Sequence, residues 1–265
     1  VHLNISKKNL RKYFAYSHIP APYTLFDNIY QLEQGENMII KATNIESKNI
    51  KYWDFKKGAD YNLFFSKLSN KDFNNKFENI IEEHSVSDKN PSLSLSSGID
   101  SFAIMKYLNK INRKFTSFTL GFENRTYDES NFVKKLPIEN KKEIIIAKES
   151  DLKSNFVNLS KLINDPIGDS SILPSYIIHK EIRKNSNVAL GGDGGDESFF
   201  GYITFDAFYL ALKIKKVIPN FILKIVNKLI LKQKKSTVYL SFMYKLKKFF
   251  DSIHLSKEYL LPSWM

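Results

Sequence analysis

Residues 91–108, PSLSLSSGIDSFAIMKYL, gather small polar side chains where an expected strand gives way to an expected helix. Ser96 and Ser101 supply hydroxyl donors, and Gly98 allows the backbone to approach a bound group closely. The first N–H groups of a helix point in one direction, and the helix dipole adds partial positive charge there. These residue types predict a phosphate-binding loop, although a serine-capped helix start without any ligand would have the same pattern.

Asp100 is the acidic residue of this loop, and its charge would repel a bare phosphate group. Its position is explained if Mg²⁺ bridges the carboxylate to the phosphate oxygens. The alternative is a carboxylate that only complements the helix dipole. The segment lacks the G-x-x-x-x-G-K-[ST] pattern of Walker-type loops, so a different kind of phosphate loop is expected.

A second glycine-rich loop follows at residues 189–202, ALGGDGGDESFFGY, with three carboxylates inside five positions, Asp193, Asp196 and Glu197. Like charges at this spacing disfavour the ionised forms unless a cation neutralises them. A solvated acidic turn is the alternative, but such a turn needs neither the apolar strand before it nor the aromatic helix after it. We therefore expect this loop to take part in metal binding.

The elements that must position these loops alternate along the chain. Strands are expected at 92–95, 115–122, 142–147 and 187–191, and helices at about 100–112, from 128 onward, at 151–163 and at 174–184. Strands separated by segments of helical length predict an α/β fold with a parallel sheet. Ligands of such sheets bind at the carboxyl ends of the strands, and both loops fall there.

The regions before and after these alternating elements have different sequence patterns. Residues 1–56 contain two β-prone runs, near 38–42 and 48–53, which predict a hairpin at the end of a β-rich domain, and a helical pattern runs from about 58 to 84. The tail, 203–265, is helical, lysine-rich and apolar. Pro219, Lys224 and Lys228 interrupt it well short of a membrane span, so an amphipathic helix packed on the domain is expected.

Composition narrows the classes of function. The 265 residues include no cysteine, which excludes disulfides, thiolate metal sites and a cysteine nucleophile within them. The net charge of +12 invites a nucleic-acid partner, but only four of the 40 basic residues are arginines and the lysines are scattered. No apolar signal segment opens the sequence, so a cytoplasmic location is expected, with neither nucleic acid nor membrane as partner.

Together the two loops resemble the synthetase domain of the glutamine-dependent asparagine synthetases. LSSGIDS is similar to the pyrophosphate loop L-S-G-G-x-D-S of that family, and GGDGGDESFFGY is similar to S-G-[ED]-G-x-D-E-x-F-x-G-Y. Between them, SFTLGFENRTYDES and NDPIGDSSILP resemble two further family segments in the same order. YFAYSHIPAPYTLFDNIYQLEQGENMII…YWDF resembles the end of the amino-terminal glutaminase domain. The likeness covers residues 13 to about 202 closely.

The resemblance implies a fold, a site and its ligands. The fold would be a nucleotide α-hydrolase domain of the PP-loop ATP pyrophosphatase (HUP-like) type, with a helical tail and a short β-rich remnant in front. ATP would be held by Leu95, Ser96, Ser97, Gly98, Asp100, Ser101, Leu120, Gly191 and Gly192, with Leu95 and Leu120 at the adenine. Asp100 and Asp196 would share Mg²⁺. Asp193 would lie beside the activated carboxyl, with Glu197 in the same catalytic loop.

The implied reaction converts aspartate, ATP and ammonia into asparagine, AMP and pyrophosphate through β-aspartyl-AMP. Residues 1–56 would be the end of a glutaminase domain, and 57–265 an ATP-binding domain that is incomplete at its carboxyl end. The sequence begins without methionine, so a piece of a longer protein is expected. The ammonia would then come from a glutaminase part outside this chain, and a homodimer stays open.

Departures from the family pattern keep other functions open. Ser97 replaces a glycine, Phe102 a small residue, and Asn164-Asp165 an Asp-Glu pair, while Pro137 interrupts an expected helix. The alternatives are an amidotransferase for another carboxylate, such as a sugar acid in polysaccharide biosynthesis, or an amide-forming cyclase. A tRNA-modifying enzyme with the same nucleotide loop and a non-catalytic remnant are two more.

Overall fold

The computed structural model describes residues 3–41, 43, 46–54, 69–123, 128, 130–231 and 241–264. Two structural units are distinguished, residues 1–192 and 193–265, and each is described by itself. The boundary expected between residues 56 and 57 lies in 55–68, outside the described residues. The assignment of 1–56 to a glutaminase-type domain therefore stays a prediction.

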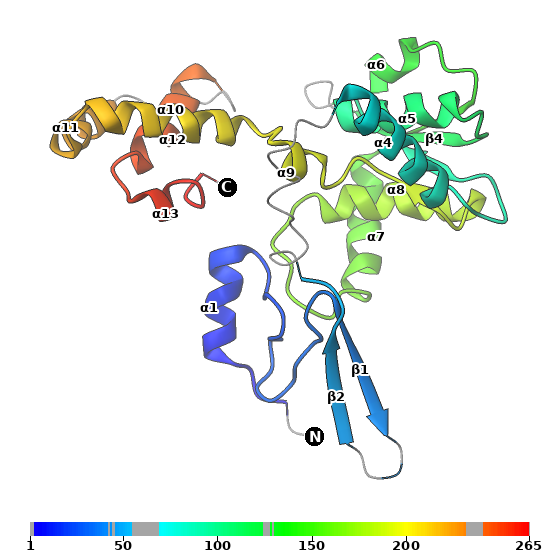
Figure 1. Ribbon diagram of the computed structural model, residues 1–265, viewed down its shortest axis with the longest axis horizontal. Coiled ribbons are helices and arrows are strands. Elements are labelled where there is room, and N and C mark those ends of the chain that lie inside the picture. Colours follow the sequence, from blue (N-terminus) through cyan, green and yellow to red (C-terminus); the bar gives the residue numbers. More distant parts are fainter. Residues whose placement is uncertain are drawn as a thin grey trace. The chain divides into compact units, whose positions relative to one another are not determined.

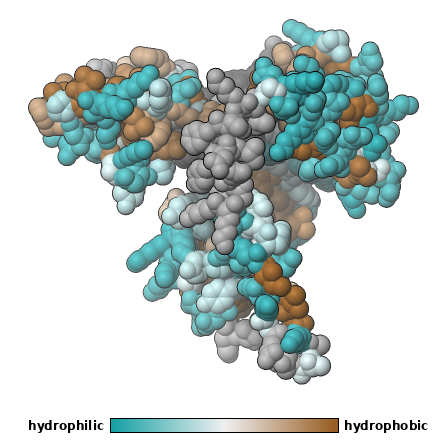
Figure 2. Space-filling view, viewed as in Figure 1, coloured by the Kyte–Doolittle hydropathy of each residue, from teal (hydrophilic) through white to brown (hydrophobic). Residues whose placement is uncertain are grey.

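The first unit begins with helix α1 (Lys7–Tyr16) and the hairpin of β1 (Glu36–Lys41) and β2 (Glu46–Lys51). The two strands pair antiparallel, from Glu36 opposite Lys51 to Lys41 opposite Glu46. The expected hairpin is confirmed, with each strand beginning two residues earlier than the β-prone run. Met38, Ile39 and Ile40 of β1 are exposed, and a hydrophobic strip follows this strand on the molecular surface (Figure 2).

The centre of this unit is the expected parallel sheet. Its strands are β3 (Ser92–Ser94), β4 (Thr116–Phe122), β5 (Lys141–Ala147) and β6 (Ala189–Leu190), in the spatial order β5-β4-β3-β6. The chain moves outward from β3 to β5 and then returns to the other side of β3 with β6. The strand order therefore switches between β3 and β6, where ligands of open α/β sheets bind.

Helices connect the strands and cover the sheet (Figure 1). They are α4 (Asn70–His84), α5 (Ile99–Lys110), α6 (Ser130–Lys135), α7 (Glu149–Ser160) and α8 (Ile172–Asn185). Leu93 of β3 packs in one core cluster with Leu108 of α5. Phe118 of β4 packs with Ile178 of α8 in another. Because strand side chains alternate between faces, these clusters lie on opposite sides of the sheet and make three layers.

The helix boundaries have local causes. Ser69 caps α4 by accepting a hydrogen bond from the Asp72 N–H at 3.1 Å, and the earlier part of the helix expected from 58 lies outside the described residues. Helix α6 ends at Lys135, two residues before Pro137, which confirms the expected interruption. A proline disfavours helical geometry in the residue before it and cannot donate a backbone hydrogen bond.

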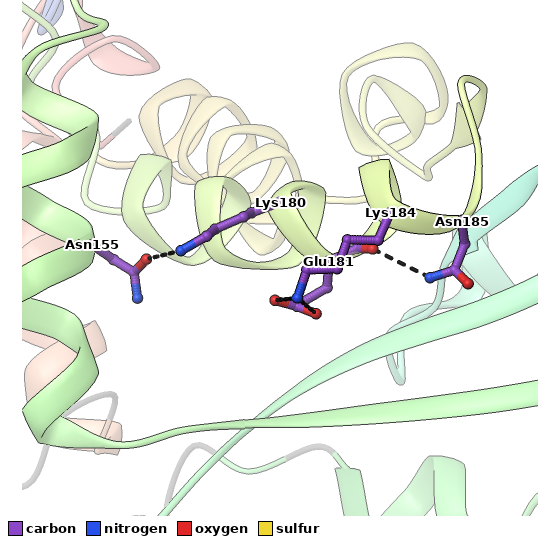
Figure 3. Close-up of polar contacts among 5 residues, drawn as sticks. All are labelled: Asn155, Lys180, Glu181, Lys184 and Asn185. Atoms are coloured by element: carbon purple, nitrogen blue, oxygen red, sulfur yellow. Dashed lines mark hydrogen bonds and ion pairs between the residues drawn. The ribbon is translucent and has the colours of Figure 1, made fainter.

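A polar contact joins α7 and α8 (Figure 3). The buried Asn155 of α7 donates to the Asp151 carbonyl at 2.9 Å and accepts from Lys180 Nζ of α8 at 3.3 Å. The remaining contacts run within α8, where Lys184 pairs with Glu181 at 2.6 Å. The asparagine thus satisfies its polar groups while it ties the two helices together.

The second unit is helical, as the tail composition predicts. It contains α9 (Gly195–Phe199), α10 (Ile203–Val217), α11 (Asn220–Leu231), α12 (Phe242–Ser252) and α13 (Lys257–Leu260). Its core gathers Ala211, Leu223, Ile253, Leu260 and Trp264. No helix in the described ranges is long and apolar enough to cross a membrane.

Candidate active site

The loop that follows β3 is closed by its own serines. The Ser101 hydroxyl accepts from the Ser96 N–H at 3.1 Å, contacts Ser96 Oγ at 3.0 Å and contacts the Gly98 carbonyl oxygen at 3.1 Å. The Gly98 N–H donates to Ser96 Oγ at 3.0 Å. These bonds place residues 96–98 directly in front of the α5 N-terminus, as the sequence predicts for a phosphate loop.

Within this loop, Ser101 is buried, whereas the residues before it are more exposed. Ser101 is 4% exposed, whereas Ser96, Ser97 and Gly98 are exposed and Asp100 is half-buried. The Ser97 side chain that replaces a family glycine therefore has room. Phe102 is 39% exposed on the outer side of α5, which explains how a large residue fits where a small one was expected.

Of the two leucines expected at the adenine, Leu95 directly follows β3 and Leu120 lies within β4. Leu95 is buried, its N–H donates to the Phe118 carbonyl at 2.8 Å, and its carbonyl accepts from Thr119 Oγ1 at 2.7 Å. Leu120 is half-buried against the Phe118 cluster and is paired with Ile145 of β5. The second lone pair of the Leu95 carbonyl is the hydrogen-bonding capacity that remains for a ligand.

Gly192, which follows β6 in the chain, packs against the start of α5. A Cβ atom added to Gly192 would lie 3.0 Å from Asp100 Cβ and 3.0 Å from the Ser101 nitrogen. Close packing therefore favours a glycine here, because a side chain would press on the start of α5. Gly191, which was predicted to line the same nucleotide, is exposed next to it.

The acidic loop belongs to the second unit. Gly194 has φ of +86°, a conformation that glycine adopts without steric cost, and it precedes the single turn of α9. At the end of α9, Phe200 also has a positive φ of 58°, and the Gly201 N–H donates to the Asp196 carbonyl at 2.9 Å. A Cβ on Gly201 would lie 2.0 Å from Asp196 Oδ1, so a larger residue at Gly201 would displace the Asp196 carboxylate.

Glu197 is held by a tyrosine of the same loop. The Tyr202 hydroxyl donates to Glu197 Oε1 at 2.6 Å. This bond is the largest cause that lowers the pKa of the Glu197 carboxyl below its ordinary value. The same bond, with the charge of Glu197, raises the pKa of Tyr202 to about 12. The glutamate is therefore kept ionised and the tyrosine protonated at neutral pH.

The structure brings some of the predicted site residues together, whereas others belong to the second unit. It brings Ser96, Gly98, Asp100, Ser101 and Gly192 together at the switch point of the sheet. Asp193, Asp196 and Glu197 continue from Gly192 into the second unit and are described with it. In the described part of the chain, no three His, Asp or Glu side chains gather into a ready-made cation site.

Sequence reasoning missed the supporting roles of several motif residues. Asp128 accepts from the Ser130 N–H at 3.0 Å and thereby caps α6. Asp169 accepts from the Ser171 N–H at 2.8 Å and from its hydroxyl at 2.7 Å, which lowers the pKa of the Asp169 carboxyl. An Asp two residues before a Ser at a helix start is a capping signal, so both roles were readable from the sequence.

Gly168, in the same motif as Asp169, meets the amino-terminal part of the chain. Its N–H donates to the Ser17 carbonyl at 2.7 Å, and an added Cβ would lie 3.0 Å from Ser17 Cβ. A cavity of about 550 Å³ lies nearby and is lined by this motif, by α7 and by Tyr13 and Leu25. The NDPIGDSSILP segment thus forms one wall of a cavity in the first unit.

A parallel sheet with a serine- and glycine-rich phosphate-type loop at the carboxyl end of β3 defines a PP-loop ATP pyrophosphatase fold. The family model of asparagine synthase matches residues 72–258. Because this match spans more than half of the chain, the protein belongs to the asparagine synthase family.

Individual relatives agree with the family match. The chain is 30% identical over 235 residues to a putative asparagine synthetase [glutamine-hydrolyzing] 2 of Methanocaldococcus jannaschii, which covers 87% of this chain and 45% of that protein. It is 29% identical over 209 residues to asparagine synthetase [glutamine-hydrolyzing] 1 of Bacillus subtilis, which covers 76% of this chain and 32% of that protein. The chain thus spans less than half the length of these relatives.

Proposed function

We propose that this chain supplies the ATP-binding part of an asparagine synthetase-type ligase. The reaction would form an amide from ammonia and the side-chain carboxylate of aspartate, with cleavage of ATP to AMP and pyrophosphate. One observation carries the proposal: a hydroxyl-lined loop at the α5 N-terminus, against which Gly192 packs without a side chain.

The first loop fits a pyrophosphate group. Ser96 and Gly98 are exposed at the α5 N-terminus, where the first N–H groups lack intrahelical partners and attract anions. Gly192 packs on Asp100 and Ser101, which supports the start of α5 from the side of β6. Leu95, directly after β3, and Leu120, within β4, would seat the adenine.

Asp100 and Asp196 are the residues that we propose to hold Mg²⁺. Magnesium ions in nucleotide sites commonly take one or two carboxylates and complete their shell with phosphate oxygens and water, so a cluster of three carboxylates is not needed. The bound ion would neutralise the charge that develops on the leaving pyrophosphate. Asp100, at the loop, provides one such ligand beside the proposed phosphate position.

The chemical steps follow from these positions. The aspartate carboxylate attacks the α-phosphorus of ATP, which releases pyrophosphate and gives β-aspartyl-AMP. Ammonia then attacks the activated carbonyl carbon and displaces AMP. Asp193 would lie beside this carbon, where a carboxylate can accept the proton that the nitrogen loses. Glu197, ionised in its bond with Tyr202, would present a fixed negative charge to the substrate.

Pyrophosphate exchange tests the proposal. The full protein is incubated with ATP, labelled pyrophosphate and aspartate, and label in ATP is measured. We expect exchange that depends on aspartate and falls about 100-fold in Asp100→Ala, because charge stabilisation at the leaving group is lost. Asp88→Ala, an exposed acid outside the loop, should keep the wild-type rate.

The residues of the two loops do not specify which carboxylate is activated, so the same assay includes other carboxylates. Exchange that requires a sugar acid instead of aspartate would mean that the substrate is a sugar acid and that the adenylation chemistry is as proposed. Exchange that no small carboxylate supports would overturn the ligase proposal.

A further inference from the structure

Tyr202 links the acidic loop to the helical core of the second unit. Its hydroxyl donates to Glu197 Oε1 at 2.6 Å, and its backbone carbonyl accepts from the Phe205 N–H at 2.9 Å. The Tyr202 ring also lies 6.1 Å from the Phe205 ring, centroid to centroid. The residue thus has one contact on the loop and two on the first turn of α10.

Helix α10 is a firm support for these contacts. It is 15 residues long, and its Ala211 is fully buried in the core of the unit. Ala207, Phe208 and Ile214 of the same helix pack against that core. A side chain fixed at the start of such a helix has a well-defined position relative to the unit.

Helix α9, which carries Glu197, is short and lies outside the core of the unit. It has five residues, and none of them is buried. The backbone bonds that hold it are short-range, from the Ser198 N–H to Gly194 and from the Gly201 N–H to Asp196. Elements with few buried contacts open locally at low cost, so the Tyr202 bond is a substantial part of what orders this turn.

We infer that Tyr202 is a positioning residue: its hydroxyl fixes the Glu197 carboxylate, and with it the turn that carries Asp196. The functional consequence rests on the proposed function. Tyr202 is assigned no contact with the reacting atoms and acts through Glu197 alone. Its removal should therefore slow the chemical step more than it weakens ATP binding, because misplaced catalytic groups cost rate.

The test is Tyr202→Phe, which keeps the ring beside Phe205 and removes only the hydroxyl. Backbone amide hydrogen exchange of residues 194–198 should become about tenfold faster, since a charge-assisted hydrogen bond is lost. In the pyrophosphate exchange assay, kcat should fall about tenfold while KM for ATP stays within about twofold. Tyr209→Phe, an exposed tyrosine of the same helix, is the matched control and should change neither quantity.

A double mutant separates positioning from a general structural effect. In a Glu197→Ala background, Tyr202→Phe should add no further acceleration of amide exchange, because its partner is already gone. An acceleration of equal size in both backgrounds, or none in the single variant, would overturn the inference. If the wild-type protein shows no carboxylate-dependent exchange, the proposed function fails, and the amide measurement alone then decides whether Tyr202 fixes the turn.

Discussion

The two loops of the candidate site are built in different ways. Residues 96–101 rest on the central strand of a sheet, and their serines bond to one another beside the buried Leu95. Residues 193–202 form an exposed turn in which Gly194 and Phe200 have positive φ, and a glutamate–tyrosine bond holds the side chains. The first loop depends on packing, whereas the second depends on local conformation and charge.

This difference matches what each loop would do. A phosphate cradle needs N–H and hydroxyl groups at fixed positions, which a sheet and a helix N-terminus supply. A loop with three carboxylates must keep several negative charges close together, and exposure to water lowers the cost of doing so. Substitutions at particular residues should therefore have different consequences in the two loops.

Gly192→Val is expected to have the largest effect, because it tests the packing on which the first loop depends. Its new side chain would meet Asp100 Cβ and the Ser101 nitrogen, both 3.0 Å from the added Cβ. Overpacking of this kind costs about 1–3 kcal/mol, which corresponds to about 5- to 150-fold weaker ATP binding if the cost falls on the bound state. Calorimetric titration with Mg²⁺-ATP measures it.

Gly98→Ala is the matched control for Gly192→Val. An added Cβ at Gly98 would lie 3.1 Å from Ser96 Oγ, which is a side-chain atom that can rotate. We expect the affinity for ATP to fall by no more than about threefold. Equal losses at both glycines would mean that close backbone packing is not what distinguishes Gly192.

Ser101→Ala should have a smaller effect on the first loop than Gly192→Val. The effect should still be measurable as a loss of stability. The substitution removes the oxygen that accepts from the Ser96 N–H, and Ser101 is 4% exposed. A hydrogen bond of this kind contributes about 0.5–1.5 kcal/mol, so the free energy of unfolding in urea should fall by that amount. Ser160→Ala, at the exposed end of α7, should leave it nearly unchanged.

Gly194→Ala probes the second loop at a position where no packing opposes a side chain. An added Cβ would meet nothing within 4 Å, so the cost is that of a positive φ of 86° alone. This cost is about 1 kcal/mol for alanine and less for asparagine. Urea unfolding should show Gly194→Asn between wild type and alanine; an alanine variant as stable as wild type would contradict the argument.

The smallest expected effect is a titration in the second loop. The hydrogen bond to Glu197 raises the pKa of Tyr202 to about 12. A raised pKa in the folded state means that the bond contributes its full stability below the ordinary tyrosine pKa of about 10 and loses it as the pH rises through about 12. In Glu197→Gln the Tyr202 pKa should fall towards 10, as followed by ¹³C NMR of labelled tyrosine without divalent ions.

Much of the fold was readable from the sequence, because local patterns specify it. The runs at 115–122 and 142–147 correspond to β4 and β5 within about one residue, and the hairpin pairs as expected. The expected strand at 187–191 is shorter, with β6 limited to Ala189–Leu190. Only these two residues pair with β3, and pairing is a property of the sheet that the apolar run alone does not specify.

Within the candidate site, the sequence by itself determined the residue types: a serine- and glycine-rich turn at a helix start, and a glycine loop with three carboxylates. The tertiary structure decided that β6 returns beside β3, so that Gly192 packs on Asp100 and Ser101. It also decided that Tyr202 bonds to Glu197. The physical reason is that helices and turns are stabilised by neighbours in the chain, whereas strand order and side-chain pairing depend on residues that meet only in the folded protein.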